Sequence, residues 1–307
     1  MSTSSPVAVD VSKTTLEVKS RFFAFETSND EKGLKTLIKR LETLNSPLVV
    51  CEATGAYERL LIATMHAKEI NVCRVNPARV RAFAKSEGIL AKTDKLDAEV
   101  ILRFAEKKQL RPLLPPDPKR EKLRNLLNRR SQIINMRTEE KNRLENHPQE
   151  LHSSFNRVLK YLEKELQRIE KQIDELILSD EKLDAQVKCL KSIIGVGDIC
   201  TLCVLAYLGE IEHLNRNQLV ALAGLAPYNR DSGLFRGKRK IIGGRGKVRN
   251  VLYMATQCAA VHNPVIREYV GALRERGKPY KVAIVAGMRK LLIHMQSELK
   301  KLNFELA

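Results

Sequence analysis

The strongest constraint in the sequence is an apolar pattern between residues 155 and 176, with alternating spacings of four and three. Its members are Phe155, Leu159, Leu162, Leu166, Ile169, Ile173 and Leu176. This spacing is the a/d seam of a heptad pattern, about three heptads long, and it requires a partner helix. The sequence leaves two alternatives for this partner: the preceding helix of the same chain in an antiparallel hairpin, or a second chain in an intermolecular coiled coil.

Residues 1–112 alternate between strand-like and helix-like patterns. Aliphatic, β-branched and aromatic runs predict strands at 7–11, 15–19, 21–27, 47–51 and 70–75. Apolar residues at helical spacing predict helices at 31–44, 57–68, from Pro77 onwards, and 92–108. Three strands followed by alternating helices and strands predict a mixed α/β sandwich.

The rest of the chain has a helical pattern. Four prolines between residues 112 and 118 predict a stiff linker, followed by a charged helix at 119–146 and the seam helix. Further on, Gly195 and Gly197 form a tight turn between two helices. This helix-hairpin-helix-like element could offer backbone N–H groups to a DNA phosphate, although ordinary helix packing would use the same glycines. We expect three segments: an α/β domain at 1–112, a linker and coiled-coil helices at 113–185, and a mainly α domain at 186–307.

The charge is concentrated at the C-terminal end. The formal net charge is +18, and residues 186–307 carry 20 basic against 8 acidic side chains. This excess points to a polyanion, with nucleic acid as the first candidate and an anionic membrane as the second. The sequence contains no run of about 18 apolar residues, so no membrane-spanning helix is predicted. The N-terminus lacks the pattern of a secretory signal, and the cysteines mostly lie in apolar runs. Both observations favour a cytoplasmic protein.

Four carboxylates are candidates for a metal site. Asp10 interrupts an apolar strand, Glu52 follows another, and Asp94 and Asp97 lie three apart on one helix face. Carboxylate oxygens suit Mg²⁺ or Mn²⁺, which can activate phosphodiester chemistry. Each residue also has a structural alternative, as a turn acceptor or a helix cap.

A basic loop near the C-terminal end surrounds a serine. Its cations, which could neutralise phosphates, are Arg230, Arg236, Lys238, Arg239, Lys240, Arg245, Lys247 and Arg249. Ser232 lies inside this loop before Gly233, where the sequence alone favours a turn serine. The pair Cys200 and Cys203 has metal-ligand spacing but lies in an apolar helix, so core packing is favoured. The sequence contains no Walker A motif.

An ordered series of motifs resembles the IS110 family of transposases. Its members are Val9–Lys13, Glu52–Gly55, Asn76–Pro77, Lys92–Ala98, Ala223–Pro227, Arg230–Gly233, Arg236–Gly237, Gly243–Arg245 and Val248–Ala255. The series covers nearly the whole chain and is weakest across the helical middle. Two of its elements, Gly243–Arg245 and Leu252–Ala255, look closest to the IS1111 subgroup.

The resemblance implies a specific chemistry. It implies a RuvC-like domain of ribonuclease-H type with Asp10, Glu52, Asp94 and Asp97 as ligands of Mg²⁺ or Mn²⁺. It also implies that Ser232 is a nucleophile that forms a covalent phosphoserine intermediate with DNA. The expected partners are donor and target DNA, a structured non-coding RNA, and further protomers, in a dimer or tetramer that shares active sites. The expected setting is the nucleoid of a bacterial or archaeal cell.

Three rival functions stay open. The first is a site-specific DNA invertase on the same scaffold, as some relatives of the family are. The second is a Holliday-junction type nuclease that uses the carboxylates alone. The third is a non-catalytic nucleic-acid binding protein. Flanking DNA separates the invertase from a transposase, replacing Ser232 by Ala separates the nuclease, and Asp10→Asn tests the non-catalytic protein.

Overall fold

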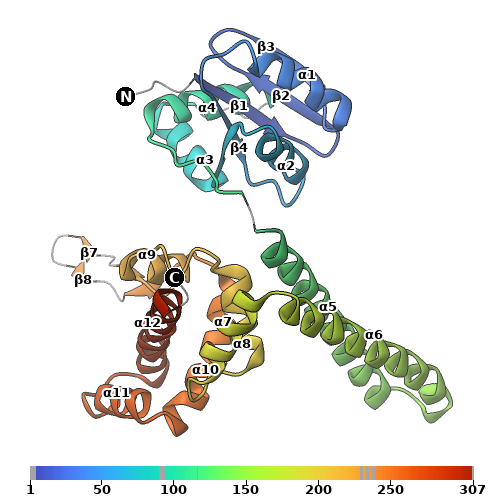
Figure 1. Cartoon of the computed structure of the whole chain (residues 1–307), viewed down its shortest axis with the longest axis vertical. Coiled ribbons are helices and arrows are strands. Elements are labelled where there is room, and N and C mark those ends of the chain that lie inside the picture. The colour runs from blue at the N-terminus through green and yellow to red at the C-terminus, as the bar shows by residue number, and fades with distance from the viewer. Residues whose placement is uncertain are drawn as a thin grey trace. The chain divides into compact units, whose positions relative to one another are not determined.

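The computed structural model (Figure 1) describes residues 5–89, 94–115, 117–228, 231–232, 235–236 and 239–305. For residues 94–96, 231, 232, 235, 236 and 305 it describes the backbone alone. The chain forms two compact units, Met1–Pro115 and Pro116–Ala307. Among the described residues, no helix has the length and apolar character needed to cross a membrane.

The first unit contains a five-stranded mixed sheet. Its strands are β1 (Ser5–Val11), β2 (Thr15–Lys19), β3 (Ala24–Ser28), β4 (Pro47–Glu52) and β5 (Asn71–Val75). Their spatial order is β3-β2-β1-β4-β5: the first three strands are antiparallel neighbours, whereas β4 and β5 run parallel to β1. All five predicted strands are present. The third begins at Ala24 instead of residue 21, because the Ser20 hydroxyl accepts the N–H groups of Phe22 and Phe23 in a turn.

Helices cover both faces of this sheet (Figure 1). The helices α1 (Glu31–Leu41) and α2 (Arg59–Ala67) pack on the face that contains Val7 and Val9. The helices α3 (Pro77–Ser86) and α4 (Asp94–Lys107) pack on the opposite face, which contains Ala8. Successive strand residues point to opposite faces, so the nearly continuous apolar run of β1 is buried on both sides. The mixed α/β sandwich is confirmed.

The second unit begins with a long antiparallel hairpin, which we call the arm. It consists of α5 (Pro118–Asn146), the 3₁₀ turn η1 (Gln149–Leu151) and α6 (His152–Leu178). Ion pairs Arg130–Glu170 at 2.8 Å and Arg137–Glu163 at 2.7 Å join the two helices in antiparallel register. The seam residues Leu162 and Leu166 pack with Ile133 of α5. The seam therefore has a partner within the chain, as the antiparallel-hairpin alternative expected.

The remaining helices form one core with the base of the arm. They are α7 (Glu181–Lys191), α8 (Asp198–Tyr207), α9 (Arg216–Leu222), α10 (Gly246–His262), α11 (Pro264–Glu275) and α12 (Tyr280–Glu305). Leu123 and Leu127 of α5 and Ile173 of α6 belong to the same buried cluster as α8, α10 and α12. The predicted segments 113–185 and 186–307 thus share a core, and their division into separate domains stays a prediction.

The predicted basic loop contains short strands. They are β6 (Pro227–Tyr228), β7 (Asp231–Ser232), β8 (Phe235–Arg236) and β9 (Lys240–Ile241). β6 pairs with β9 and β7 pairs with β8, both antiparallel. Two-residue strands show no recognisable sequence period, so the pattern predicted only a polar loop.

Two helical glycines allow a test of the packing between α1 and β3. A Cβ built on Gly33 would lie 1.9 Å from the Ser28 carbonyl oxygen, whereas a Cβ on Gly271 of α11 would meet nothing within 4 Å. We predict that Gly33→Ala destabilises the first unit by about 1–3 kcal/mol through overpacking. Gly271→Ala should stabilise its helix by about 0.5–1 kcal/mol. Calorimetric unfolding of both full-length variants measures this; equal stability of Gly33→Ala and the wild type would contradict the packing.

Candidate active site

Asp10 and Glu52 lie side by side at the carboxyl ends of two parallel strands. Val9 of β1 is in register with Cys51 of β4, so the next residues along the two strands are Asp10 and Glu52. Both alternate with residues of the α3/α4 face: Ala8 precedes Asp10 by two, and Val50 precedes Glu52 by two. Because residues two apart in a strand share a face, the two carboxylates lie on that same face. Both side chains are partly exposed.

The N-terminal end of α4 lies toward the same end of the sheet. Two ion pairs fix the direction of the helix: Lys19 of β2 binds Glu99 at 2.7 Å, and Arg21 binds Glu106 at 2.6 Å. Lys19 is in register with Ala8, and the chain from Lys19 to Arg21 runs away from Asp10. Along α4, the direction from Glu106 through Glu99 to residue 94 therefore points toward the end of the sheet where Asp10 lies.

Asp94 and Asp97 share a helix position pattern with two buried residues of α4. Each precedes a fully buried residue by four, Ala98 and Ile101 respectively, and residues four apart lie on one face of a helix. Asp97 is partly exposed, and only the backbone of Asp94 is described. The four predicted carboxylates thus belong to three elements that meet at one end of the sheet.

Sequence reasoning missed two further carboxylates in the same row. Glu17 of β2 is directly opposite Asp10, and Glu26 of β3 is directly opposite Glu17. With Glu52 they form an acidic row across four neighbouring strands. Like charges directly opposite each other destabilise a sheet. A row of this kind favours the presence of a cation, and the sequence could not reveal it because strand register is a tertiary property.

The donor set suits a hard divalent cation such as Mg²⁺, which prefers carboxylate oxygens. Among the described side chains, no three from His, Cys, Asp and Glu are grouped closely enough to hold a metal ion. Asp10 and Glu52 are the two that lie on adjacent parallel strands. The contribution of Asp94 lies outside the described side chains.

Glu58 organises the loop that follows Glu52, and the sequence patterns did not single it out. Its Oε2 accepts the Ala56 N–H at 3.0 Å, the Thr54 hydroxyl at 3.2 Å and the Thr54 N–H at 3.3 Å. The buried side chain is also 3.4 Å from Arg74 of β5. Burial raises the pKa of Glu58, but these hydrogen bonds and that of its own backbone N–H outweigh burial and hold the pKa below the ordinary value. The loop conformation thus depends on an ionised Glu58.

This dependence gives a pH prediction. A carboxylate with a lowered pKa stabilises the fold above its unfolded pKa, near 4.3, and this contribution is lost as the pH falls through the folded value. We expect Glu58→Gln to cost about 1–3 kcal/mol at pH 7. The difference from the wild type should shrink between about pH 5 and pH 3. Thermal unfolding across this range measures it, with exposed Glu42→Gln as control; a constant difference would contradict the assignment.

Ser232 lies at the end of a two-part β-hairpin. Ser232 pairs with Phe235 and Asp231 with Arg236, while Tyr228 pairs with Lys240 nearer the base. Only the backbone of Ser232 is described, so the orientation of its hydroxyl is outside the structure. We call residues 227–241 the serine hairpin.

Close backbone contacts fix the base of the serine hairpin. Gly224, Gly243 and Gly244 all have a φ of 71°, and a Cβ on Gly244 would lie 2.2 Å from the Gly224 nitrogen. The Arg249 guanidinium donates to the Gly243 carbonyl at 2.7 Å. The two sequence motifs at 223–227 and 243–245 therefore come together in space, where only glycine fits.

The predicted phosphate-binding cations divide into two groups. Arg239 and Lys240 are exposed, Arg236 is described by its backbone only, and Arg230 and Lys238 lie outside the described residues. In contrast, Arg245, Lys247 and Arg249 contact groups of the protein itself. Their binding to nucleic acid stays a prediction. In the structure, Arg245 and Lys247 contact Tyr207 of α8, and Arg249 holds the glycines at the base of the serine hairpin.

The helix-hairpin-helix-like turn lies between α7 and α8. Gly195 has a φ of 93°, and a Cβ there would lie 2.6 Å from the Ala259 Cβ of α10, so this glycine serves close packing. Gly197 is the N-cap of α8 and has open space beside it. Gly197 is therefore the better placed of the two to meet a phosphate.

Two matched regions relate this chain to known transposases. Residues 7–153 match a family model described as "Transposase" for the DEDD transposases of IS110, and residues 187–271 match the transposase IS116/IS110/IS902 family. A pilin gene-inverting protein from Moraxella lacunata is 31% identical over 251 residues, which is 80% of this chain and 77% of the relative. The corresponding Moraxella bovis protein is 28% identical over 303 residues, 93% of this chain and 92% of the relative.

The chain belongs to the IS110 transposase family. The two matched regions divide its candidate residues: the first contains Asp10, Glu52, Asp94 and Asp97, and the second contains Ser232 and the basic loop. Membership in this family of transposases and DNA-inverting proteins implies DNA recombinase activity. Assignment to the IS1111 subgroup stays a prediction.

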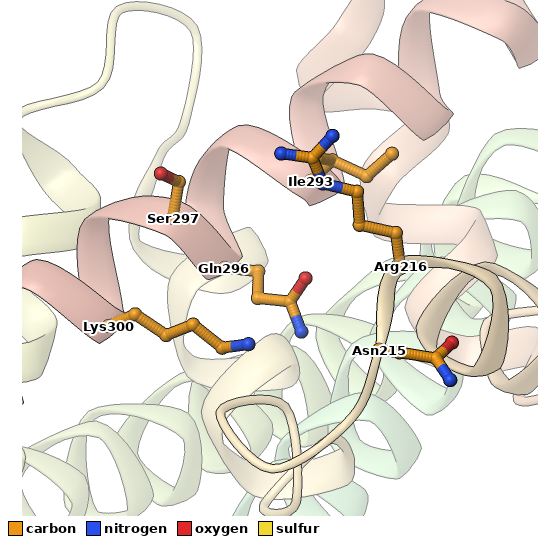
Figure 2. A pocket seen from close by; sticks show the side chains of 6 residues that line it. All are labelled: Asn215, Arg216, Ile293, Gln296, Ser297 and Lys300. Atoms are coloured by element: carbon orange, nitrogen blue, oxygen red, sulfur yellow. The ribbon is translucent and has the colours of Figure 1, made fainter.

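Two other features of this IS110-family chain lie away from the candidate residues. Cys200 and Cys203 are buried in the core, which confirms the predicted core role of this pair, and burial raises the pKa of Cys200 to about 12 and that of Cys203 to about 11. A pocket of about 270 Å³ lies between the start of α9 and α12 (Figure 2). It is lined by Asn215, Arg216, Ile293, Gln296, Ser297 and Lys300. Its cations are Arg216 and Lys300, and none of the predicted catalytic residues lines it.

Proposed function

We propose that this chain is a DNA transposase or site-specific recombinase that cleaves and rejoins DNA through a phosphoserine intermediate. The proposal rests first on the family, whose activity is DNA recombination. The observation that carries it further is the strand register that puts Asp10 beside Glu52, with the N-terminal end of α4 toward the same end of the sheet. That arrangement is what a carboxylate metal site at a sheet edge requires.

In the proposed reaction, the Ser232 Oγ attacks a DNA phosphorus atom. A new P–O bond to serine forms while the bond to one deoxyribose oxygen breaks, and the leaving oxygen takes a proton as a free hydroxyl. Because one phosphodiester replaces another, a different DNA hydroxyl can later attack the phosphoserine, join the strands and return the serine. Ser232 needs help to lose its proton, since a serine hydroxyl is a weak nucleophile. Arg239 and Lys240 of the serine hairpin could neutralise the phosphate.

Asp10, Glu52, Asp94 and Asp97 would hold Mg²⁺ or Mn²⁺. The bound ion would stabilise negative charge on the phosphoryl oxygens and help to activate the nucleophile. The acidic row across β4, β1, β2 and β3 supports this assignment, because it presents hard oxygen donors whose mutual repulsion a cation would relieve. We also propose that the first unit has a RuvC-like, ribonuclease-H type fold. Its mixed five-stranded sheet with helices on both faces supports this.

The proposed partners are donor and target DNA, a structured non-coding RNA and further protomers. The positive charge of residues 186–307 supports nucleic-acid binding. We propose that the metal residues of one protomer act with Ser232 of another, in a dimer or tetramer. The intrachain use of the 155–176 seam means that such an assembly would use other surfaces. Nucleoid localisation is part of the same proposal.

Site-specific inversion is the second candidate function. It is favoured by the two relatives named as pilin gene-inverting proteins, which align over most of their lengths. The chemistry at Ser232 would be the same, and the arrangement of the DNA sites would differ. Supplying the flanking DNA as an invertible segment or as an element with a separate target distinguishes the two functions.

The nucleophile is tested by replacing Ser232. We predict that the wild type, incubated with supercoiled DNA and Mg²⁺, gives a protein–DNA adduct on denaturing electrophoresis, and that Ser232→Ala reduces it at least a hundredfold, as for other groups that act directly in catalysis. Ser153→Ala, a serine of α6, is the control and should keep the adduct. An adduct retained in Ser232→Ala would contradict the proposal, and DNA hydrolysis without any adduct would favour the nuclease alternative.

Metal binding is tested without any DNA. At a Mg²⁺ or Mn²⁺ concentration 100 times the Kd, binding should stabilise the first unit by about 2.7 kcal/mol. We predict that Asp10→Asn and Glu52→Gln lose most of this stabilisation, whereas Glu42→Gln on α1 keeps it. Thermal unfolding with and without the ion measures the effect. Equal stabilisation of Asp10→Asn and the wild type by the ion would contradict the metal assignment.

A further inference from the structure

The C-terminal end of α8 is held by three arginines from two different parts of the second unit. Arg120 of α5 donates to the Leu205 carbonyl at 2.7 Å, and Arg124 donates to the Ala206 carbonyl at 3.2 and 3.3 Å. Arg245, which follows the serine hairpin, donates to the Tyr207 carbonyl. The last carbonyls of a helix have no partner within the helix and carry partial negative charge. Each of these three therefore receives a cationic donor from another element.

The Tyr207 side chain joins the same elements a second time. Two cations contact its ring, with the Arg124 guanidinium carbon 5.7 Å and the Lys247 Nζ 5.4 Å from the ring centroid. Its hydroxyl donates to Asn128 of α5, and Lys247 of α10 donates to the same amide oxygen. Cation–π contacts and hydrogen bonds thus connect α5, α8 and α10 through one aromatic residue.

Arg245 carries these contacts to the base of the serine hairpin. Its guanidinium binds both carboxylate oxygens of Glu210, at 2.5 and 3.0 Å, and its backbone N–H donates to the Leu222 carbonyl at 2.8 Å. Arg245 directly follows Gly244, whose backbone packs on Gly224. A guanidinium held in a bidentate ion pair has little freedom. Arg245 therefore fixes the C-terminal end of the serine hairpin.

We propose that Arg245 and Glu210 are positioning residues for Ser232, and that the C-terminal end of α8 couples the arm to the serine hairpin. On this proposal, Arg245 acts on the hairpin, not on DNA phosphate, and movement of the arm changes the hydrogen bonds of Arg120 and Arg124 at the same helix end. A DNA or RNA strand that moves the arm would thereby change the mobility of the hairpin. The catalytic part rests on the proposed role of Ser232, and the coupling part does not.

The first test compares two carboxylates. Glu210→Gln weakens the ion pair with Arg245, while Glu268→Gln is the control, because Glu268 is exposed on α11. Hydrogen exchange is measured without DNA on peptides that cover residues 222–245. We expect exchange about tenfold faster in Glu210→Gln, as the loss of one charged hydrogen bond would give, and within twofold of wild type in Glu268→Gln.

The second test moves to the arm. Arg124→Gln removes the bonds to Ala206 and the contact with Tyr207, whereas Arg137→Gln removes an arginine of α5 whose ion pair with Glu163 lies farther along the arm. Arg124→Gln should speed exchange in residues 222–245 several-fold, and Arg137→Gln should leave it unchanged. If Glu210→Gln fails to fold, Arg245→Lys is the substitute, because it keeps the charge without the bidentate geometry. It should also speed hydrogen exchange in residues 222–245.

The outcomes separate the two parts of the proposal. Unchanged exchange in both Glu210→Gln and Arg245→Lys overturns the positioning role. Faster exchange in Glu210→Gln with no change in Arg124→Gln overturns the coupling to the arm. The rate of adduct formation should fall about tenfold in Glu210→Gln and stay unchanged in Glu268→Gln. If Ser232→Ala still forms the adduct, the proposed function fails while the exchange measurements keep their meaning.

Discussion

A buried helix cannot leave its end carbonyls without donors, and this constraint organises the second unit around α8. Seven of the ten residues of α8 are buried, and the helix contacts α5, α7 and α10. Its last carbonyls lie where water cannot satisfy all of them, so cationic donors from α5 and from the segment before α10 take that role. The arm and the segment that follows the serine hairpin consequently meet at the end of one helix, on neighbouring carbonyls. Their connection follows from the need to satisfy one helix end.

The first unit obeys a related constraint at its sheet. Both faces are covered by helices, and the carboxylates Asp10, Glu17 and Glu52 lie toward one end of the sheet. The parallel strands β1 and β4 carry carboxylates at equivalent places: Glu52 is the last residue of β4, and Asp10 is the last but one of β1. The loop after β4 is in turn held by the buried Glu58. An acidic row at one end of a sheet and a cationic hairpin in the other unit give the chain two oppositely charged sites that a DNA phosphate and a divalent cation could bring into one reaction.

The sequence predicted these elements to different extents, and the reasons are physical. The five strands, the helices and the four carboxylates were predictable because burial imposes local periods and makes a charge in an apolar strand conspicuous. The partner of the 155–176 seam was not, since a heptad pattern fixes a stripe and leaves its partner open. Glu17 and Glu26 were missed because register depends on how distant strands align. Arg245 was predicted as a phosphate contact, and its hydrogen bonds to Tyr207 and Glu210 became visible only in three dimensions.

The central claim, a covalent bond between Ser232 and DNA, is tested most directly by mass spectrometry of the trapped adduct. The adduct is denatured, digested with nuclease and protease, and the peptide that carries a nucleotide is sequenced. The account predicts the added mass on Ser232, with wild-type protein and Mg²⁺ present. A nucleotide on another residue, or cleaved DNA with unmodified Ser232 throughout the reaction, would contradict it.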